Sequence, residues 1–232
     1  MTSETEADLP DVKLADVQQE LEPLTGMSVW ARMRLSYIDM RRTTRVLIEE
    51  NPTEPRLLVF VLLSDILFFL ARGVQLVVSP STAAQQNVPL EVGMWLVGIL
   101  LIRTAMMYLF AAFIRIGGWV FGGQASWKSA RTAVFWASLV AAPAGIFGAL
   151  VGAGLAHLEP FYPIVATDLF AWPPLLIGPV AFVYFLSAAV AEAHRFERTS
   201  PVFVTFSIMT VVLIVAAIVF APVLTGVLGQ GM

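Results

Sequence analysis

The stretch TAVFWASLVAAPAGIFGALVGAGLA, residues 132–156, decides the fold class. It contains no Asp, Glu, Lys or Arg, and it is longer than the roughly 20 residues that a helix needs to cross a hydrocarbon core of about 30 Å. Its apolar side chains fall on every face of a helix, so the alternation that a membrane β-strand requires is absent. The stretch therefore predicts a transmembrane helix.

Four further stretches reach a similar length and apolar character, at about 57–78, 92–114, 172–191 and 202–224. The chain of 232 residues is 58% hydrophobic and 13% charged, and that charged share is about half of the share in an ordinary soluble domain. The sequence thus predicts an all-α integral membrane protein. Its membrane domain is expected over residues 53–228, with five transmembrane helices.

Basic residues outside these stretches lie before the first, between the second and third, and between the fourth and fifth. They are Lys13, Arg32, Arg34, Arg41, Arg42, Arg45 and Arg56, then Arg115, Lys128 and Arg131, then Arg195 and Arg198. The segments 79–91 and 157–171 and the tail after Leu224 have none. Because short loops rich in Lys and Arg stay in the cytoplasm, we expect a cytoplasmic N-terminus and a C-terminus outside.

The segment before the first span divides into two parts. Residues 1–26 are acidic and can bury little apolar surface, so we expect a largely disordered cytoplasmic tail. Residues 27–52 are expected to form a basic amphipathic helix, with Ser28 as its N-cap and with Asn51 and Pro52 ending it.

This helix is expected to lie on the membrane surface and to face anionic lipid headgroups. The residues predicted to make that contact are Trp30, Arg32, Arg34, Arg41, Arg42 and Arg45. The pattern also fits a helix with two packed faces, one on lipid and one on the protein's own loops.

Three ionisable residues lie inside the first two spans: Asp65, Arg72 and Arg103. Each is costly at the centre of a membrane helix, so isolated placement toward lipid is disfavoured. Asp65 and Arg72 share a helix face about 10 Å apart, and Arg103 on the antiparallel second span falls at a depth between them. We therefore expect Asp65 and Arg103 to pair, either as a structural clamp or as part of a site for an ion or a lipid headgroup.

Small residues recur every fourth position in the third span, at Ala144, Gly148, Gly152 and Ala156. Such a stripe lets a neighbouring backbone approach closely, more often within one chain than between chains. Pro143 in the third span and Pro179 in the fourth are expected to bend their helices.

The sequence has few of the residues and motifs that are typical of catalytic, metal-binding or nucleic-acid-binding sites. The chain has no cysteine and two histidines, so thiolate metal sites and cysteine nucleophiles are excluded and other metal sites are disfavoured. Gly117, Gly118, Gly122 and Gly123 form a glycine-rich turn, but no strand precedes it as in a phosphate-binding loop. We expect no cofactor, no nucleic-acid partner and no enzymatic activity.

Three stretches resemble the bacterial branch of the Yip-domain family, which is named for eukaryotic membrane proteins that interact with Ypt and Rab GTPases. They are RVLIEENPTEP at residues 45–55, GGWVFGGQASWKSARTAVFWASLVAAP at 117–143 and AEAHRFE at 191–197. The resemblance implies a five-span bundle with a cytoplasmic N-terminus, and in eukaryotes a role in vesicle traffic, membrane shaping and binding of prenylated GTPases. This chain lacks the Asp-Leu-Tyr-Gly-Pro type of element expected before the first span, so GTPase binding is not carried over.

Together these features predict a non-enzymatic protein of a bacterial inner membrane that organises membrane or serves as a scaffold or accessory subunit of another membrane complex. Its expected partners are the bilayer, anionic lipids, and another membrane protein or a second copy of the chain. The alternative is a transporter of a small solute or lipid, or a lipid-binding protein, that uses the Asp65, Arg72 and Arg103 cluster.

Overall fold

The computed structural model describes residues 26–78 and 88–229. The predicted acidic tail, up to residue 25, lies outside the described residues, as does most of the segment between the first two spans. The described residues form helices joined by turns.

The long helices follow the five predicted stretches. They are α4 (Glu54–Val78), α6 (Val88–Val97), which continues through the π-helix η2 (Gly98–Arg103) into α7 (Thr104–Val120), α8 (Trp127–Leu158), α9 (Asp168–Ala193) and α10 (Ser200–Gly229). A short 3-10 helix, η3 (Pro163–Ala166), joins α8 to α9.

Four segments are long and apolar enough to cross a membrane. They are Glu54–Leu76, Val92–Val120, Trp127–Leu158 and Leu169–Ala193. In α10 the described apolar part, Ser200–Ala216, is shorter. The chain is thus an integral, multi-pass membrane protein, and the fifth span stays a prediction.

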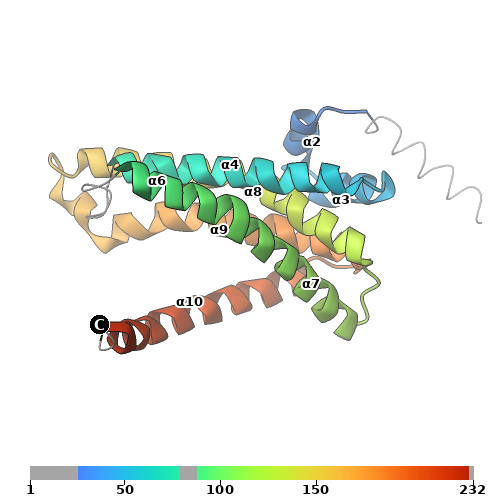
Figure 1. Cartoon of the computed structure of the whole chain (residues 1–232). Helices are drawn as coiled ribbons and strands as arrows, with labels where there is room; N and C mark the ends of the chain where they lie inside the picture. The colour runs from blue at the N-terminus through green and yellow to red at the C-terminus, as the bar shows by residue number, and fades with distance from the viewer. Residues whose placement is uncertain (1–25, 79–87, 230–232) are drawn as a thin grey trace, which may run out of the picture.

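Helix α8 lies at the centre of the bundle and packs against α9, α4 and α7. Its side chains Phe135, Trp136 and Leu139 are fully buried, and the ring of Phe60 from α4 packs edge-on against Trp136. Helix α10 diverges from the other long helices (Figure 1), and its contacts are mainly with α9. The core therefore lies between α4, α8 and α9.

Glycines bring α8 and α9 close together. A Cβ atom on Gly148 would lie 2.5 Å from the carbonyl oxygen of Pro174, and one on Gly178 would lie 3.0 Å from the Cα of Gly145. Gly152 also faces Pro174. At Gly148 and Gly152 the small-residue stripe thus packs against another helix of the same chain, and Gly145 extends this contact. Of the other predicted stripe positions, Ala144 and Ala156 are half-buried.

The segment expected to form one amphipathic helix forms two, α2 (Val29–Ser36) and α3 (Met40–Glu49). Ser28 caps α2 as predicted, accepting a hydrogen bond from the Ala31 amide at 3.3 Å. The break arises at Asp39, whose carboxylate accepts from the Arg42 amide at 3.0 Å and so starts a new helix. A capping side chain that satisfies free amides competes with continuation of the first helix.

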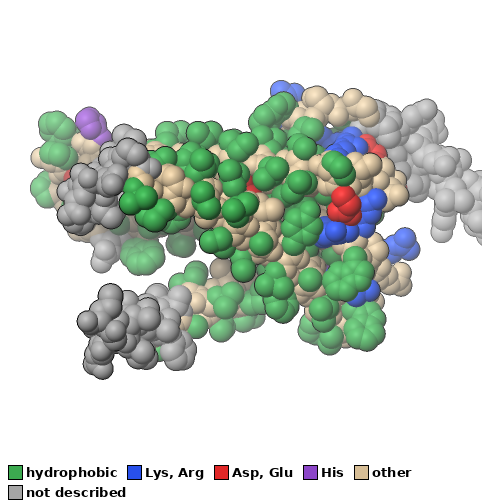
Figure 2. All heavy atoms as spheres, in the orientation of Figure 1, with side chains coloured by type: hydrophobic (Ala, Val, Ile, Leu, Met, Phe, Trp, Pro, Cys, Tyr) green, Lys and Arg blue, Asp and Glu red, His purple; other side chains and the backbone are tan. Residues whose placement is uncertain are grey.

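Charged side chains gather at one end of the bundle. Figure 2 shows Lys, Arg, Asp and Glu concentrated around α2 and α3, whereas hydrophobic side chains cover most of the remaining visible face. We call this end, which holds α2, α3, the starts of α4 and α8 and the end of α9, the polar end. Helix α10 begins there and runs to the opposite end (Figure 1).

Candidate functional site

The polar end is held together first by Glu50, which follows α3. Arg32 on α2 is 3% exposed, and its two terminal nitrogens donate to the Glu50 carboxylate at 2.6 and 3.0 Å. Arg56 at the start of α4 forms a second ion pair with Glu50 at 2.9 Å. Burial alone would raise the pKa of Glu50, but the two arginines together hold it below its ordinary value. Glu50 therefore stays ionised and links α2, α3 and α4.

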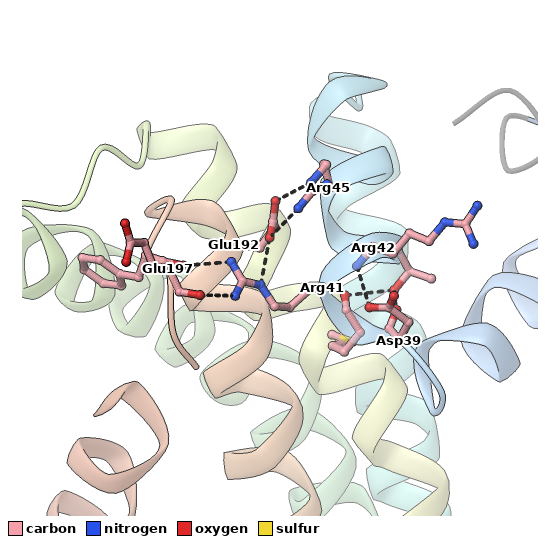
Figure 3. Close-up of polar contacts among 9 residues, drawn as sticks. Asp39, Arg41, Arg42, Arg45, Glu192 and Glu197 are labelled. Carbon is pink, nitrogen blue, oxygen red and sulfur yellow. Dashed lines mark hydrogen bonds and ion pairs between the residues drawn. The ribbon is translucent and has the colours of Figure 1, made fainter. Parts of the chain in front are cut away.

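A second contact joins α3 to the end of α9. Arg41 Nε donates to Glu192 Oε2 at 3.0 Å, and Arg45 Nε donates to Glu192 Oε1 at 2.7 Å. The terminal nitrogens of Arg41 also donate to the backbone carbonyls of Phe196 at 2.8 Å and Glu197 at 2.9 Å. Figure 3 shows both arginines converging from α3 on Glu192. We call Arg41, Arg45 and Glu192 the α3–α9 clasp.

The corner between α2 and α3 is anchored on α8. Trp136 Nε1 donates to Ser36 Oγ at 3.2 Å, and Ser36 shares a 2.8 Å hydrogen bond with Thr43. The Tyr37 hydroxyl donates to the backbone carbonyl of Val140 at 2.9 Å. Val140 lies about 20 Å along α8 from its first residue, at 1.5 Å rise per residue. The corner thus reaches the membrane-spanning part of α8.

The predicted membrane-surface residues fall into two groups. Trp30, at 58% exposed, and Arg34 lie on the outer surface, and the Arg42 side chain points away from Glu192 in Figure 3. The other three, Arg32, Arg41 and Arg45, bind carboxylates of the protein itself. Protein packing, left open by the sequence pattern, therefore accounts for these three arginines, while lipid contact stays a prediction.

Two glycines pack against His194, which follows α9: Gly118 lies in α7, not in a turn as the sequence predicted, and Gly123 lies in the turn after α7. Cβ atoms on Gly118 and Gly123 would lie 2.1 and 2.2 Å from the imidazole ring, so only glycine fits beside it. Burial is the main cause of the lowered pKa of His194, and the positive charge of Arg115 adds to it. Gly122 has φ +81° and turns the chain toward α8. Gly118 and Gly123 thus serve packing, and Gly122 serves the turn.

Inside the membrane domain, the structure brings together the two residues predicted to pair. Arg103 forms an ion pair with Asp65, which is fully buried. Thr104 Oγ1 donates to the second carboxylate oxygen of Asp65 at 2.5 Å. Arg103 also donates to Ser64 Oγ at 3.1 Å and to Ser138 Oγ at 2.8 Å. These groups join α4, α8 and the second span.

The π-helix η2 positions two adjacent residues on Asp65. Arg103 ends η2, and Thr104 begins α7. The i→i+5 bonds of a π-helix place more residues in each turn than an α-helix does, and such segments are frequent at functional sites. Apart from Arg103, the residues of η2 are an ordinary apolar stretch, which carries no signal for this local change.

Arg72, the third predicted residue, lies apart from the Asp65 pair. Its Nη1 donates to Gln75 Oε1 at 2.8 Å, and its guanidinium lies 4.5 Å from the ring centre of Trp95. Both Arg72 and Arg103 line a cavity of about 560 Å³ between α4, α8, α9 and the second span. The three ionisable residues therefore form a pair and a separate cation, and the cavity is lined by Arg103 of the pair and by Arg72.

Sequence reasoning did not identify the partners Glu50, Glu192, Ser64, Ser138 and Thr104. Glu192 carries the clearest available signal, because it is an acidic residue at the end of an apolar span within the stretch 191–197. The stretches 45–55 and 191–197 meet in the clasp through Arg45 and Glu192. Glu54 of the first stretch pairs with Arg131 of the stretch 117–143 at 2.7 Å.

A family model described as the Yip1 domain matches residues 35–221. The chain belongs to the Yip1-domain family. No curated protein and no solved structure matches it significantly. The Yip1 domain begins in α2 and ends in α10, so it contains the clasp, the α2–α3 corner and the intramembrane cavity.

Proposed function

We propose that this Yip1-domain protein is a non-enzymatic scaffold of a bacterial inner membrane that organises the bilayer through its N-terminal helices. It spans the membrane five times with its polar end in the cytoplasm. Helices α2 and α3 occupy the cytoplasmic leaflet beside the bundle. The cross-section of the protein is therefore larger in the cytoplasmic leaflet than in the opposite leaflet.

The observation that carries this proposal is the α2–α3 corner. On its inner side, Tyr37 bonds to Val140 in the spanning part of α8. On its outer side, Ile38 is 86% exposed and Trp30 is also exposed. An exposed apolar corner at this depth is stable in hydrocarbon and costly in water.

The polar contacts favour a structural role for the charged groups at this end. Glu50 and Glu192 are each held by two arginines, which keeps both helices fixed on the bundle. The basic residues expected to keep this end in the cytoplasm lie in the same region. A rigidly held pair of helices in one leaflet favours curvature toward that leaflet, and it also offers a surface to another membrane protein.

Curvature preference tests the proposal in the full chain. Labelled protein is reconstituted into giant vesicles with its polar end outward, and thin membrane tubes are pulled from them. We expect a higher protein density on the tube than on the vesicle, because the tube's outer leaflet is expanded. Ile38→Gln should bring the two densities toward equality.

Ile164→Gln is the matched control, because Ile164 is an exposed isoleucine in η3, at the opposite end of the bundle. It should leave the enrichment on the tube intact. Equal wild-type densities on tube and vesicle, or equal losses in the two variants, would contradict a role for the α2–α3 corner.

A second candidate function is binding of a ligand at the intramembrane cluster. The cavity favours it, since Arg72 and Arg103 both line an open space of about 560 Å³. A purely structural clamp between Asp65 and Arg103 needs no such space.

A further inference from the structure

The intramembrane cavity is lined by polar and by apolar residues. Its polar lining comes from Ser64, Arg72, Gln75, Arg103 and Ser138. The lining that α9 contributes is entirely apolar and consists of prolines, a glycine and aliphatic and aromatic side chains. A ligand that fits both kinds of lining has a polar group and an apolar body.

The cavity carries an excess of positive charge among the described residues. Arg103 is paired with Asp65, but Asp65 is fully buried behind it and does not line the cavity. The contacts described for Arg72 are with neutral groups, the Gln75 amide and the Trp95 ring. Two guanidinium groups thus line the cavity, and one carboxylate, that of Asp65, offsets their charge. An unbalanced charge at this depth is costly.

Arg72 also has an unused donor. Its Nε is buried and has no hydrogen-bond acceptor among the described residues. A buried donor without an acceptor costs free energy, so the protein itself does not supply the full set of acceptors that the Arg72 guanidinium needs. Arg103, whose side chain is 20% exposed, lines the same cavity.

We infer that this cavity binds a phosphate group, with Arg72 and Arg103 as its charged ligands. Guanidinium groups match phosphate oxygens in geometry and charge. The phosphate comes from an anionic lipid headgroup or from free phosphate in solution. This inference rests on the ligand-binding function proposed for the cavity and is independent of the scaffold function.

The test measures the thermal unfolding midpoint of the purified full chain in a neutral detergent. Three probes are added separately: a short-chain phosphatidylglycerol, the matching phosphatidylcholine, and inorganic phosphate. We expect the midpoint to rise with phosphatidylglycerol or with inorganic phosphate, because a ligand that binds the folded state stabilises it. Phosphatidylcholine, which has no net charge, should act more weakly than phosphatidylglycerol.

Arg72→Gln should weaken binding of the active probe by about tenfold or more, since hydrogen bonds to charged groups are strong. Arg72→Lys keeps the positive charge but lacks the planar guanidinium group, so its affinity for the probe should fall less than that of Arg72→Gln. It also provides the test if Arg72→Gln does not fold. Arg131→Gln removes an arginine at the polar end, outside the cavity, and should keep the full response.

Each outcome decides the inference. A response to phosphatidylglycerol that depends on Arg72 assigns the phosphate to a lipid, and an Arg72-dependent response to inorganic phosphate assigns it to solution. Equal responses to the two lipids, unchanged by Arg72→Gln, would overturn the phosphate site while leaving lipid binding in place. No response to any probe would overturn the ligand-binding function as well.

Discussion

Asp65 is fully buried and accepts from Arg103 and Thr104, so its charge is compensated by groups of the second span. Asp65→Ala removes the carboxylate and leaves Arg103 without its counter-charge, which should lower stability by about 3–5 kcal/mol. The double change Asp65→Ala with Arg103→Ala should recover much of this loss. The measurement is the unfolding free energy of each variant in mixed micelles.

A double mutant no more stable than either single mutant would contradict the pairing. The serine hydroxyls set a limit on the recovery, because Ser64 and Ser138 lose a donor when Arg103 is removed. They still share a hydrogen bond of 3.0 Å with each other, so we expect the recovery to exceed half.

Glu50 gives the protein a stability that depends on pH. Its pKa is lower in the folded protein than the ordinary value of 4.5, so its contribution is complete above that value. It is lost as the pH falls through the lower folded pKa. The difference in unfolding midpoint between wild type and Glu50→Gln should therefore be constant near neutral pH and shrink below about pH 4.5.

The neighbouring Glu49 is a matched control with the opposite sign. Burial, together with the charge of Glu192, raises its pKa in spite of Arg45. Glu49→Gln should then be at least as stable as wild type at pH 7, and any gain should vanish as the pH falls toward about 4. The same pH trend in both variants would contradict the assigned ion pairs.

At the scale of elements, the clasp fixes α3 against α9. Glu192→Gln weakens both arginine contacts, and because Arg41 and Arg45 are partly exposed we expect a loss of about 1 kcal/mol. Hydrogen exchange of the α3 amides should then be about fivefold faster. The measurement is hydrogen–deuterium exchange followed by mass spectrometry of the α3 peptides.

Glu197→Gln is the control for this exchange experiment, because Arg41 bonds to the backbone carbonyl of Glu197 rather than to its carboxylate. Its α3 exchange should match that of the wild type. If both variants accelerate exchange equally, the effect comes from net charge and not from the clasp.

The contact of α8 with α9 depends on the missing side chain at Gly148. Gly148→Ala places a methyl group against the Pro174 carbonyl and should cost about 1–3 kcal/mol through overpacking. A Cβ atom on Gly154, in the same helix, would meet nothing within 4 Å, so Gly154→Ala should leave the unfolding midpoint unchanged or slightly higher. Equal destabilisation by both changes would point to the helix itself, not to the interface.

The elements show where local sequence patterns stop being informative. The spacing of apolar residues across Tyr37 to Met40 continues a helix, but the Asp39 carboxylate starts a new one there. The stripe through Gly148 predicted a close approach, yet the orientation of α8 toward α9 decides that Gly145 takes part. A local sequence pattern reports the secondary-structure propensity of a segment, but it does not report where the neighbouring helices lie.

For the whole molecule, hydropathy predicted the long helices, since each apolar stretch must be a helix to satisfy its own backbone in lipid. Helical geometry also predicted that Asp65 and Arg103 lie at matching depth. The clasp was not predicted, because Arg41 and Glu192 are 151 residues apart and meet only once the bundle has formed. The cavity likewise depends on the joint placement of four elements.

The central claim is a five-span protein whose polar end is cytoplasmic, and the location of the C-terminus tests it most directly. Helix α10 starts at the polar end and ends at the opposite one (Figure 1). Alkaline phosphatase and a fluorescent protein are fused in turn after Met232 of the full chain in bacterial cells. We predict phosphatase activity with the first fusion and no fluorescence with the second. Fluorescence without phosphatase activity would place the C-terminus in the cytoplasm and contradict the account.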